Sequence, residues 1–160
     1  MRELPHTRSC FVCGEDNPGG LHLRFTTDGR TVRTRFRPGA AHIGFRGIVH
    51  GGLLATLLDE IMVWACAVSA RRFAFCAELQ VRFLNPTRPG DEIVATGEML
   101  TNRKDRVYEA KATLADSSGR SLAEAIGKYL PIKSGNVTGL LSDVIGDIGW
   151  LNPGGGTSAG

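Results

Sequence analysis

The sequence has almost no excess charge of either sign, which limits the partners that we expect for it. Its 160 residues carry 19 lysines and arginines against 16 aspartates and glutamates, a formal net charge of +3. The basic residues are scattered, and aromatic residues make up only 7% of the chain. A nucleic-acid interface needs a basic patch and aromatic residues for stacking. We therefore predict no nucleic-acid partner.

Long uninterrupted apolar runs and a secretory leader are also missing. The most apolar stretch, residues 53–68, is interrupted by Thr56, Asp59 and Glu60, whereas a membrane span needs about 20 predominantly apolar residues. Residues 1–6 lack the apolar region of a signal peptide. We predict no membrane association and a cytoplasmic location.

Cysteine is scarce, because the chain contains only four. In a reducing cytosol these are expected to be free thiols. Cys10 and Cys13 have the spacing of half a zinc site, but no second pair of ligands with suitable spacing follows. The alternative is a small N-terminal turn that packs both thiols against a sheet. We predict neither a bound metal nor a cofactor.

The apolar pattern predicts one α+β domain over residues 1–132, with the Cys-x-x-Cys segment at residues 1–20. An almost wholly apolar helix begins at Gly51 or Gly52, and strands joined by short turns follow it. Such short connections require an antiparallel sheet. A helix that is apolar on every side needs cover on every side, which a curled sheet would supply. The predicted strands are residues 21–25, 32–37, 73–83, 91–100, 106–115 and 121–130.

Residues 133–160 form a different kind of segment, a C-terminal tail. Its apolar residues recur at helical spacing, but three glycines weaken any helix there. Residues 152–160 are rich in glycine, serine and threonine and are predicted to be disordered.

The strongest functional signal is a His50-Gly51-Gly52 turn followed by Asp59 in the apolar helix. A buried carboxylate is costly, so Asp59 is a catalytic candidate. The alternative is a surface helix with Asp59 and Glu60 on its one wet face. The first N–H groups of a helix lack partners, so Gly51 or Gly52 can donate to a carbonyl oxygen that gains negative charge.

The glycines and the aspartate are too far apart to serve one reacting carbon within one chain. Gly52 and Asp59 lie on nearly the same helix stripe, with an axial gap of about 10 Å. Either the two features have different functions, or Asp59 of one subunit faces the His-Gly-Gly turn of another. A two-fold dimer would then contain two equivalent sites.

The motif Gly-Ile-Val-His-Gly-Gly, with an aspartate nine positions after the histidine, resembles the hotdog-fold acyl-CoA thioesterases of the PaaI-like branch. Residues 10–21 and 82–91 are similar to further segments of that superfamily, and the resemblance runs from about residue 10 to residue 132. It implies a hotdog fold, in which a curled antiparallel sheet wraps one long buried helix. It also implies a homodimer that often pairs again into a homotetramer, a dimer of dimers.

The resemblance further implies roles for individual residues. The Gly51 N–H would polarise the thioester carbonyl, and Asp59 from the facing subunit would act as general base or nucleophile. His50 would shape the turn in a supporting role, beside Gly52. We therefore predict hydrolysis of an acyl-CoA to free acid and CoA. The alternatives are a non-catalytic acyl-CoA-binding hotdog protein and a hotdog acyl-thioester dehydratase or hydratase.

Five further residues are candidates for substrate binding. His42 lies in a loop where the family often has asparagine, and Cys76 stands where it often has threonine or serine. Glu60 ranks second to the aspartate, as a carboxylate that pairs with an arginine or tunes its neighbour. Arg82 and Arg88 lie at strand ends and turns, where they could reach CoA phosphates. The aromatic residues near the helix could line an acyl pocket or simply fill the core.

Overall fold

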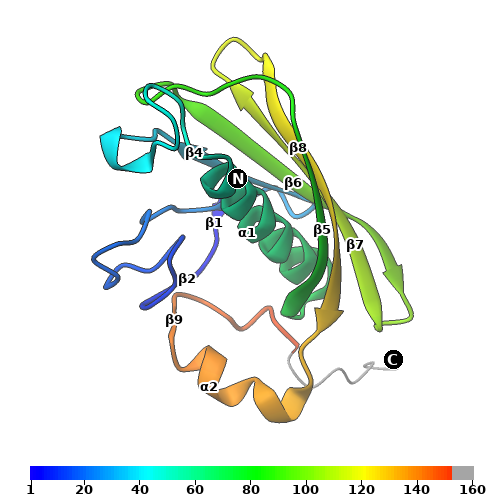
Figure 1. Cartoon of the computed structure of the whole chain (residues 1–160). Helices are drawn as coiled ribbons and strands as arrows, with labels where there is room; N and C mark the ends of the chain where they lie inside the picture. The colour runs from blue at the N-terminus through cyan, green and yellow to red at the C-terminus, as the bar shows by residue number, and fades with distance from the viewer. Residues whose placement is uncertain (153–160) are drawn as a thin grey trace.

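The computed structural model describes residues 1–152, in which a seven-stranded antiparallel sheet curls around one long helix (Figure 1). The helix is α1 (Gly51–Ala70), and the sheet order is β1-β3-β4-β6-β7-β8-β5. The predicted α+β hotdog architecture is therefore confirmed. The strands are β1 (Arg2–Glu3), β2 (His6–Thr7), β3 (Thr26–Thr27), β4 (Thr31–Phe36), β5 (Ala74–Phe83), β6 (Ile93–Arg103), β7 (Val107–Asp116), β8 (Ser121–Pro131) and β9 (Val144–Ile145). Short helices are η1 (Ala40–His42), η2 (Ser134–Asn136) and α2 (Thr138–Leu141).

Local chemistry sets both ends of α1. At its start, the Nδ1 atom of His50 accepts the Gly52 N–H at 2.9 Å and so caps one unpaired donor. At its end, Arg71 adopts the left-handed conformation (φ 56°) that terminates helices. In the middle, Gly97 of β6 allows close approach, because an added Cβ would lie 3.0 Å from the Ile61 carbonyl oxygen. The buried residues of α1 are Leu54, Leu57, Leu58, Ile61, Met62, Trp64, Ala65, Cys66, Ala67 and Val68.

The apolar character of α1 has a second interpretation. By length and composition alone the helix could cross a membrane, with a mean hydropathy of 1.7, although we expected its polar residues to prevent this. Half of that window is buried inside the domain, as in a core helix. The absence of membrane association and the cytoplasmic location stay predictions.

The strand that we expected over residues 21–25 is wrong. Only Thr26–Thr27 pairs with β4, and the preceding residues pair their backbone with the Cys-x-x-Cys segment instead. The Leu21 N–H donates to the Phe11 carbonyl at 2.8 Å, and the Leu23 N–H donates to the Val12 carbonyl at 2.9 Å. The alternating pattern therefore reflects packing against this turn rather than membership of the sheet.

β5 forms one edge of the sheet, and it does not keep strict alternation. Its register against β8 shifts between Cys76 and Glu78, which marks a β-bulge. In a strand with strict alternation, Phe75 and Leu79 would point to the same face. Because of the bulge, Leu79 packs against the core while Phe75 is 59% exposed. The bulge thereby moves Cys76 to the helix side of the strand.

The segment after β8 packs against the N-terminal residues, over the side of α1 that the sheet leaves open (Figure 1). β9 pairs with β2, and the Ser9 hydroxyl donates to the Asp143 carboxylate at 2.6 Å. Val137 and Leu151 are buried. The disorder predicted for the end of the chain falls, apart from residue 152, outside the described residues.

Candidate functional site

The predicted hydrogen-bond donor and the predicted catalytic carboxylate fall into two separate cavities along α1. A cavity of about 510 Å³ at the helix start is lined by His50 and Gly51. Another, of about 500 Å³, is lined by Asp59, Glu60 and Cys76. The donor and the carboxylate of the predicted site therefore do not share a cavity within one chain.

The helix start presents one free donor to the first cavity. His50 already accepts the Gly52 N–H, while the Gly51 N–H has no acceptor among residues 1–152. The ring of Phe83 lies beside Gly51, where an added Cβ would be 3.3 Å from its Cζ atom. The helix dipole adds partial positive charge at this point, so a carbonyl oxygen could accept a hydrogen bond here.

His42 supports the loop before the helix rather than the two cavities. Its Nδ1 atom accepts the Gly39 N–H at 2.9 Å, and its carbonyl accepts the His50 N–H at 2.9 Å. Its ring packs against Phe36, and it lines a third hollow beside His50. His42 therefore holds the His-Gly-Gly turn in place through the backbone.

Asp59 is held by Tyr129 of β8, a residue that sequence reasoning missed. The Tyr129 hydroxyl donates to Oδ1 of Asp59 at 2.9 Å. Burial, and then the charge of Asp59, raises the pKa of Tyr129, so it stays a protonated donor. Gly127 leaves room for the ring, since an added Cβ would lie 2.7 Å from the Tyr129 Cε2 atom. The only sign of this contact in the sequence is Gly127, two residues before Tyr129 in the same strand, which leaves space for the tyrosine ring.

Cys76 lies on the same side as Asp59. Burial, and then the charge of Asp59, raises the pKa of the Cys76 thiol to about 11. The thiol is therefore neutral near pH 7 and can donate only weak hydrogen bonds in this cavity.

Glu60 lines the same cavity as Asp59 but points toward the N-terminal segment. Its Oε1 atom accepts the Trp64 indole N–H at 3.1 Å and lies 3.8 Å from the Cys10 sulfur. The predicted pairing with an arginine is wrong, because Glu60 forms no ion pair within residues 1–152. Burial raises its pKa to about 8. The thiol of Cys10 thus contacts the helix, whereas the alternative for the N-terminal turn placed both thiols against a sheet.

Arg82 and Arg88 line neither cavity. Arg82 pairs with Glu124 at 3.0 Å, and the Arg88 backbone N–H donates to Asp91. They do flank residues 83–87, which form one wall of the first cavity. Both side chains are exposed there, so Arg88 can reach a ligand above that wall, whereas Arg82 would first have to leave its ion pair with Glu124.

The second cavity also has an apolar wall. Trp64, Phe73 and Phe75 line it, whereas Met62 is fully buried in the core. Gly139 and Leu140 of the C-terminal segment add to the lining. The cavity therefore combines one polar end, at the carboxylates, with an aromatic interior.

Comparison with known proteins links this geometry to one superfamily. Residues 46–111 match the family model of the thioesterase superfamily. The mouse (Mus musculus) protein acyl-coenzyme A thioesterase 13 is 27% identical over 84 residues, which cover 52% of this chain and 60% of that protein. The chain thus spans less than two thirds of the length of the curated relatives that it matches.

Solved structures show the same fold. Protein RHA08564, a thioesterase superfamily protein, superposes with a TM-score of 0.71 at 24% identity and covers 77% of this chain and 63% of its own. The E. coli PaaI protein, from the phenylacetic acid degradation operon, superposes with a TM-score of 0.64 at 21% identity, covering 70% and 80%. These structures have the fold that the resemblance implies, and the match to the family model bears out the resemblance that the His-Gly-Gly and aspartate motif predicts.

Proposed function

We propose that this hotdog-fold chain, which matches the thioesterase superfamily over residues 46–111, hydrolyses an acyl-CoA thioester to the free acid and CoA. The observation that carries the proposal is the division of the site between two cavities. The free Gly51 N–H lines one, and the Tyr129-bound carboxylate of Asp59 lines the other. A two-fold dimer brings the two halves together. The acyl-CoA substrate class is supported by the name of the mouse relative.

The position of β5 at the edge of the sheet supports a dimer formed through this strand. Phe83, near one end of β5, lies beside Gly51, and Cys76, near the other end, lies beside Asp59. If two copies of β5 pair antiparallel about an axis at Gln80, Leu79 of one subunit lies opposite Val81 of the other, and the one-residue bulge after Cys76 brings Cys76 opposite Phe83. Paired strands lie about 4.8 Å apart. The Gly51 end of one subunit then adjoins Asp59 of the partner subunit.

The same pairing removes an exposed strand edge and exposed apolar groups from water. Phe75 and Phe83 of β5 are 59% and 56% exposed in the single chain. An unpaired edge with apolar side chains is a liability that association relieves. We therefore propose that the active form is a homodimer, with a dimer of dimers as a further assembly.

In this arrangement each group has a defined task. The Gly51 N–H and the helix dipole stabilise the negative charge that develops on the thioester oxygen. Asp59, held by Tyr129, either takes a proton from water as water attacks the acyl carbon or attacks that carbon itself. The carbon–sulfur bond breaks, and the sulfur leaves as CoA thiolate. In the first route the thiolate takes the proton that Asp59 removed from water. In the second route the acyl group stays on Asp59 as an anhydride, which water hydrolyses to the free acid and the Asp59 carboxylate, and the proton released goes to the thiolate. The arginines beside the first cavity, Arg82 and Arg88, are candidates to bind CoA phosphates.

The activity is tested by incubating the purified chain with a panel of acyl-CoA esters and a thiol reagent. Free CoA appears only if the thioester is hydrolysed, so the assay separates hydrolysis from binding and from hydration. Asp59→Asn is expected to lower kcat by about a hundredfold or more. A wild-type protein that releases no CoA from any ester would refute the proposal.

The shared site has its own experiment, based on two inactive variants. Gly51→Pro removes the N–H, and Asp59→Asn removes the base. A heterodimer of the two, co-expressed with different tags and purified through both, has one intact site out of two. We expect about half of the wild-type activity per dimer, whereas each homodimer is inactive. An inactive heterodimer would mean that both residues act within one chain.

A further inference from the structure

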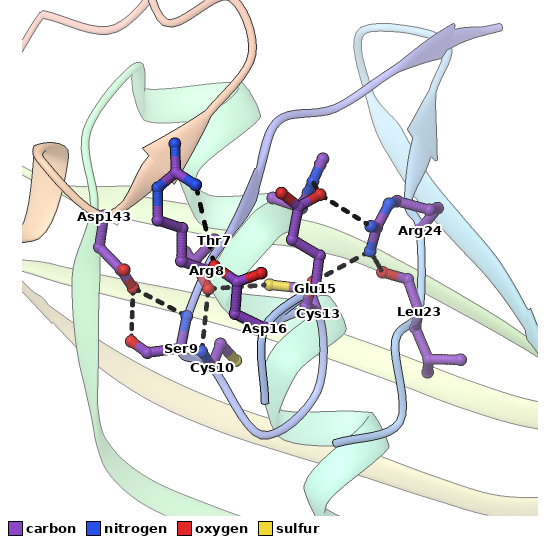
Figure 2. Close-up of polar contacts among 11 residues, drawn as sticks. Thr7, Arg8, Ser9, Cys10, Cys13, Glu15, Asp16, Leu23, Arg24 and Asp143 are labelled. Atoms are coloured by element: carbon purple, nitrogen blue, oxygen red, sulfur yellow. Dashed lines mark hydrogen bonds and ion pairs between the residues drawn. The ribbon is translucent and has the colours of Figure 1, made fainter. Parts of the chain in front are cut away.

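The fold brings a third potential metal ligand, Glu60, next to the cysteine pair Cys10 and Cys13. The sulfurs of Cys10 and Cys13 and one carboxylate oxygen of Glu60 all lie within 4.8 Å of one another. Figure 2 shows the two cysteines on one turn of the N-terminal segment, with Thr7 in contact with the Cys13 sulfur at 3.6 Å. The third ligand comes from α1, far away in the sequence.

The turn that carries the cysteines is built to hold a sulfur anion. The Val12 N–H donates to the Cys10 sulfur at 3.2 Å, and the Gly14 N–H donates to the Cys10 carbonyl at 2.9 Å. Only glycine fits after Cys13, because a Cβ on Gly14 would lie 2.3 Å from that carbonyl oxygen. The Val12 N–H can therefore offset part of the negative charge that a metal-bound Cys10 sulfur carries.

The third ligand lacks a compensating charge. Glu60 Oε1 accepts hydrogen bonds from the Trp64 indole N–H and from the Cys10 thiol, and no lysine or arginine of the described residues pairs with it. Two sulfurs and a carboxylate thus face one another in a sparsely solvated position without a basic partner, and a divalent cation between them would balance the negative charge that they carry as ligands.

We propose that Cys10, Cys13 and Glu60 bind a zinc ion whose fourth coordination position opens into the cavity of Asp59. Two sulfurs and one carboxylate oxygen are ligands that zinc accepts. Tetrahedral bonds of about 2.0–2.3 Å put the ligand atoms roughly 3.5–3.8 Å apart. The Cys10 sulfur and Glu60 Oε1 are already 3.8 Å apart, so small side-chain rotations are enough.

The open fourth position follows from the lining of the cavity. Cys10 and Glu60 both line the 500 Å³ cavity, so water can reach the ion from that side. The ion would also tie the N-terminal segment to α1 at the residue next to Asp59. The zinc site does not depend on the proposed hydrolysis, because it uses neither Gly51 nor Asp59.

The test measures metal directly in the full chain. The protein is purified with a phosphine reductant and without chelator, and its zinc is quantified by mass spectrometry. Cobalt(II) is then titrated into the metal-free protein to follow the thiolate-to-cobalt absorption and the intense visible bands of tetrahedral cobalt. We expect one zinc per chain and a tetrahedral spectrum with thiolate ligands.

Variants assign the ligands. Cys10→Ser and Cys13→Ser should lose the metal, and Glu60→Gln should weaken its binding about tenfold or more. Cys76→Ser is the matched control, because its thiol lines the same cavity outside the cluster, and it should keep the metal. Circular dichroism of Glu60→Gln checks that the fold is retained. Asp59→Asn should keep zinc while it loses hydrolysis, which separates this proposal from the previous one.

Three results would overturn the zinc site. The first is zinc uptake by the reduced wild-type protein no greater than that of a Cys10→Ser, Cys13→Ser double variant. The second is a folded Glu60→Gln variant that binds zinc as tightly as wild type. The third is an octahedral cobalt spectrum without thiolate absorption.

Discussion

Substitution of Gly51 tests the electrophilic half of the site, because two variants separate the N–H from the space around it. Gly51→Pro removes the donor. Proline is favoured at the first position of a helix, and its neighbour His50 already has the extended backbone (φ −62°, ψ 127°) that a following proline requires. Gly51→Ala keeps the donor and adds a similar Cβ. Gly51 is absent from the positive-φ residues among those described, so neither variant strains the backbone there.

The size of the expected effect follows from the loss of one oxyanion donor. Gly51→Pro should lower kcat by roughly 10²–10³, or about 2.7–4 kcal/mol of transition-state stabilisation. In both variants the added Cβ meets Phe83, at 3.3 Å from Cζ for an ideal Cβ, so the ring must shift slightly. Because Gly51→Ala keeps its N–H, its kcat should fall by no more than about tenfold, from a slightly displaced acyl group.

The assay is steady-state release of CoA by the two folded variants, with thermal unfolding as the control for the helix. The proline variant should unfold within a few degrees of wild type, since it loses no intrahelical hydrogen bond. A proline variant with the kcat of the alanine variant would refute the role of the Gly51 N–H. The turn would then act through its shape alone.

Two further predictions concern the residues around Asp59. Tyr129→Phe removes one hydrogen bond, so it should lower kcat about tenfold and leave KM nearly unchanged, while the stability loss stays near 1 kcal/mol; an equal rise in KM would instead indicate a role in binding. Because the raised pKa of Cys76 (about 11) lies above that of an ordinary thiol, its alkylation at pH 8 should be roughly a hundredfold slower than that of free cysteine and should accelerate up to pH 11. Peptide mass spectrometry of the labelled protein measures this rate, and fast labelling at pH 8 would contradict the burial and charge assigned to the thiol.

The sequence predicts those parts of the fold that depend on local pattern. The start of α1 follows from the His-Gly-Gly turn before an apolar run, and the antiparallel sheet follows from short connections. The sequence could not predict which residues of β5 point to the core, because the one-residue bulge after Cys76 exchanges the core-facing and solvent-facing positions that alternation gives. The backbone pairing of Leu21 and Leu23 with the cysteine turn was equally hidden, since alternation alone does not name the partner.

In the candidate site, too, some residues can be predicted from local spacing and others only from the fold. His50, Gly51 and Asp59 are found from spacing along one helix. Tyr129 joins Asp59 across 70 positions of sequence, and Cys10 joins Glu60 across 50. Such contacts depend on how the segments before and after the helix fold back over it, which periodicity does not encode.

The two adjacent carboxylates show how one helix serves two different environments. Successive residues of a helix point about 100° apart, so Asp59 faces the sheet, where Tyr129 donates to it, and Glu60 faces the N-terminal segment, where Cys10 lies. Both line the same cavity, yet they share no hydrogen-bond partner among the described residues. A change at Asp59 should therefore affect hydrolysis without releasing a metal. A change at Glu60 should weaken metal binding while the Tyr129–Asp59 hydrogen bond remains, because the helix, and not the neighbouring carboxylate, positions each one.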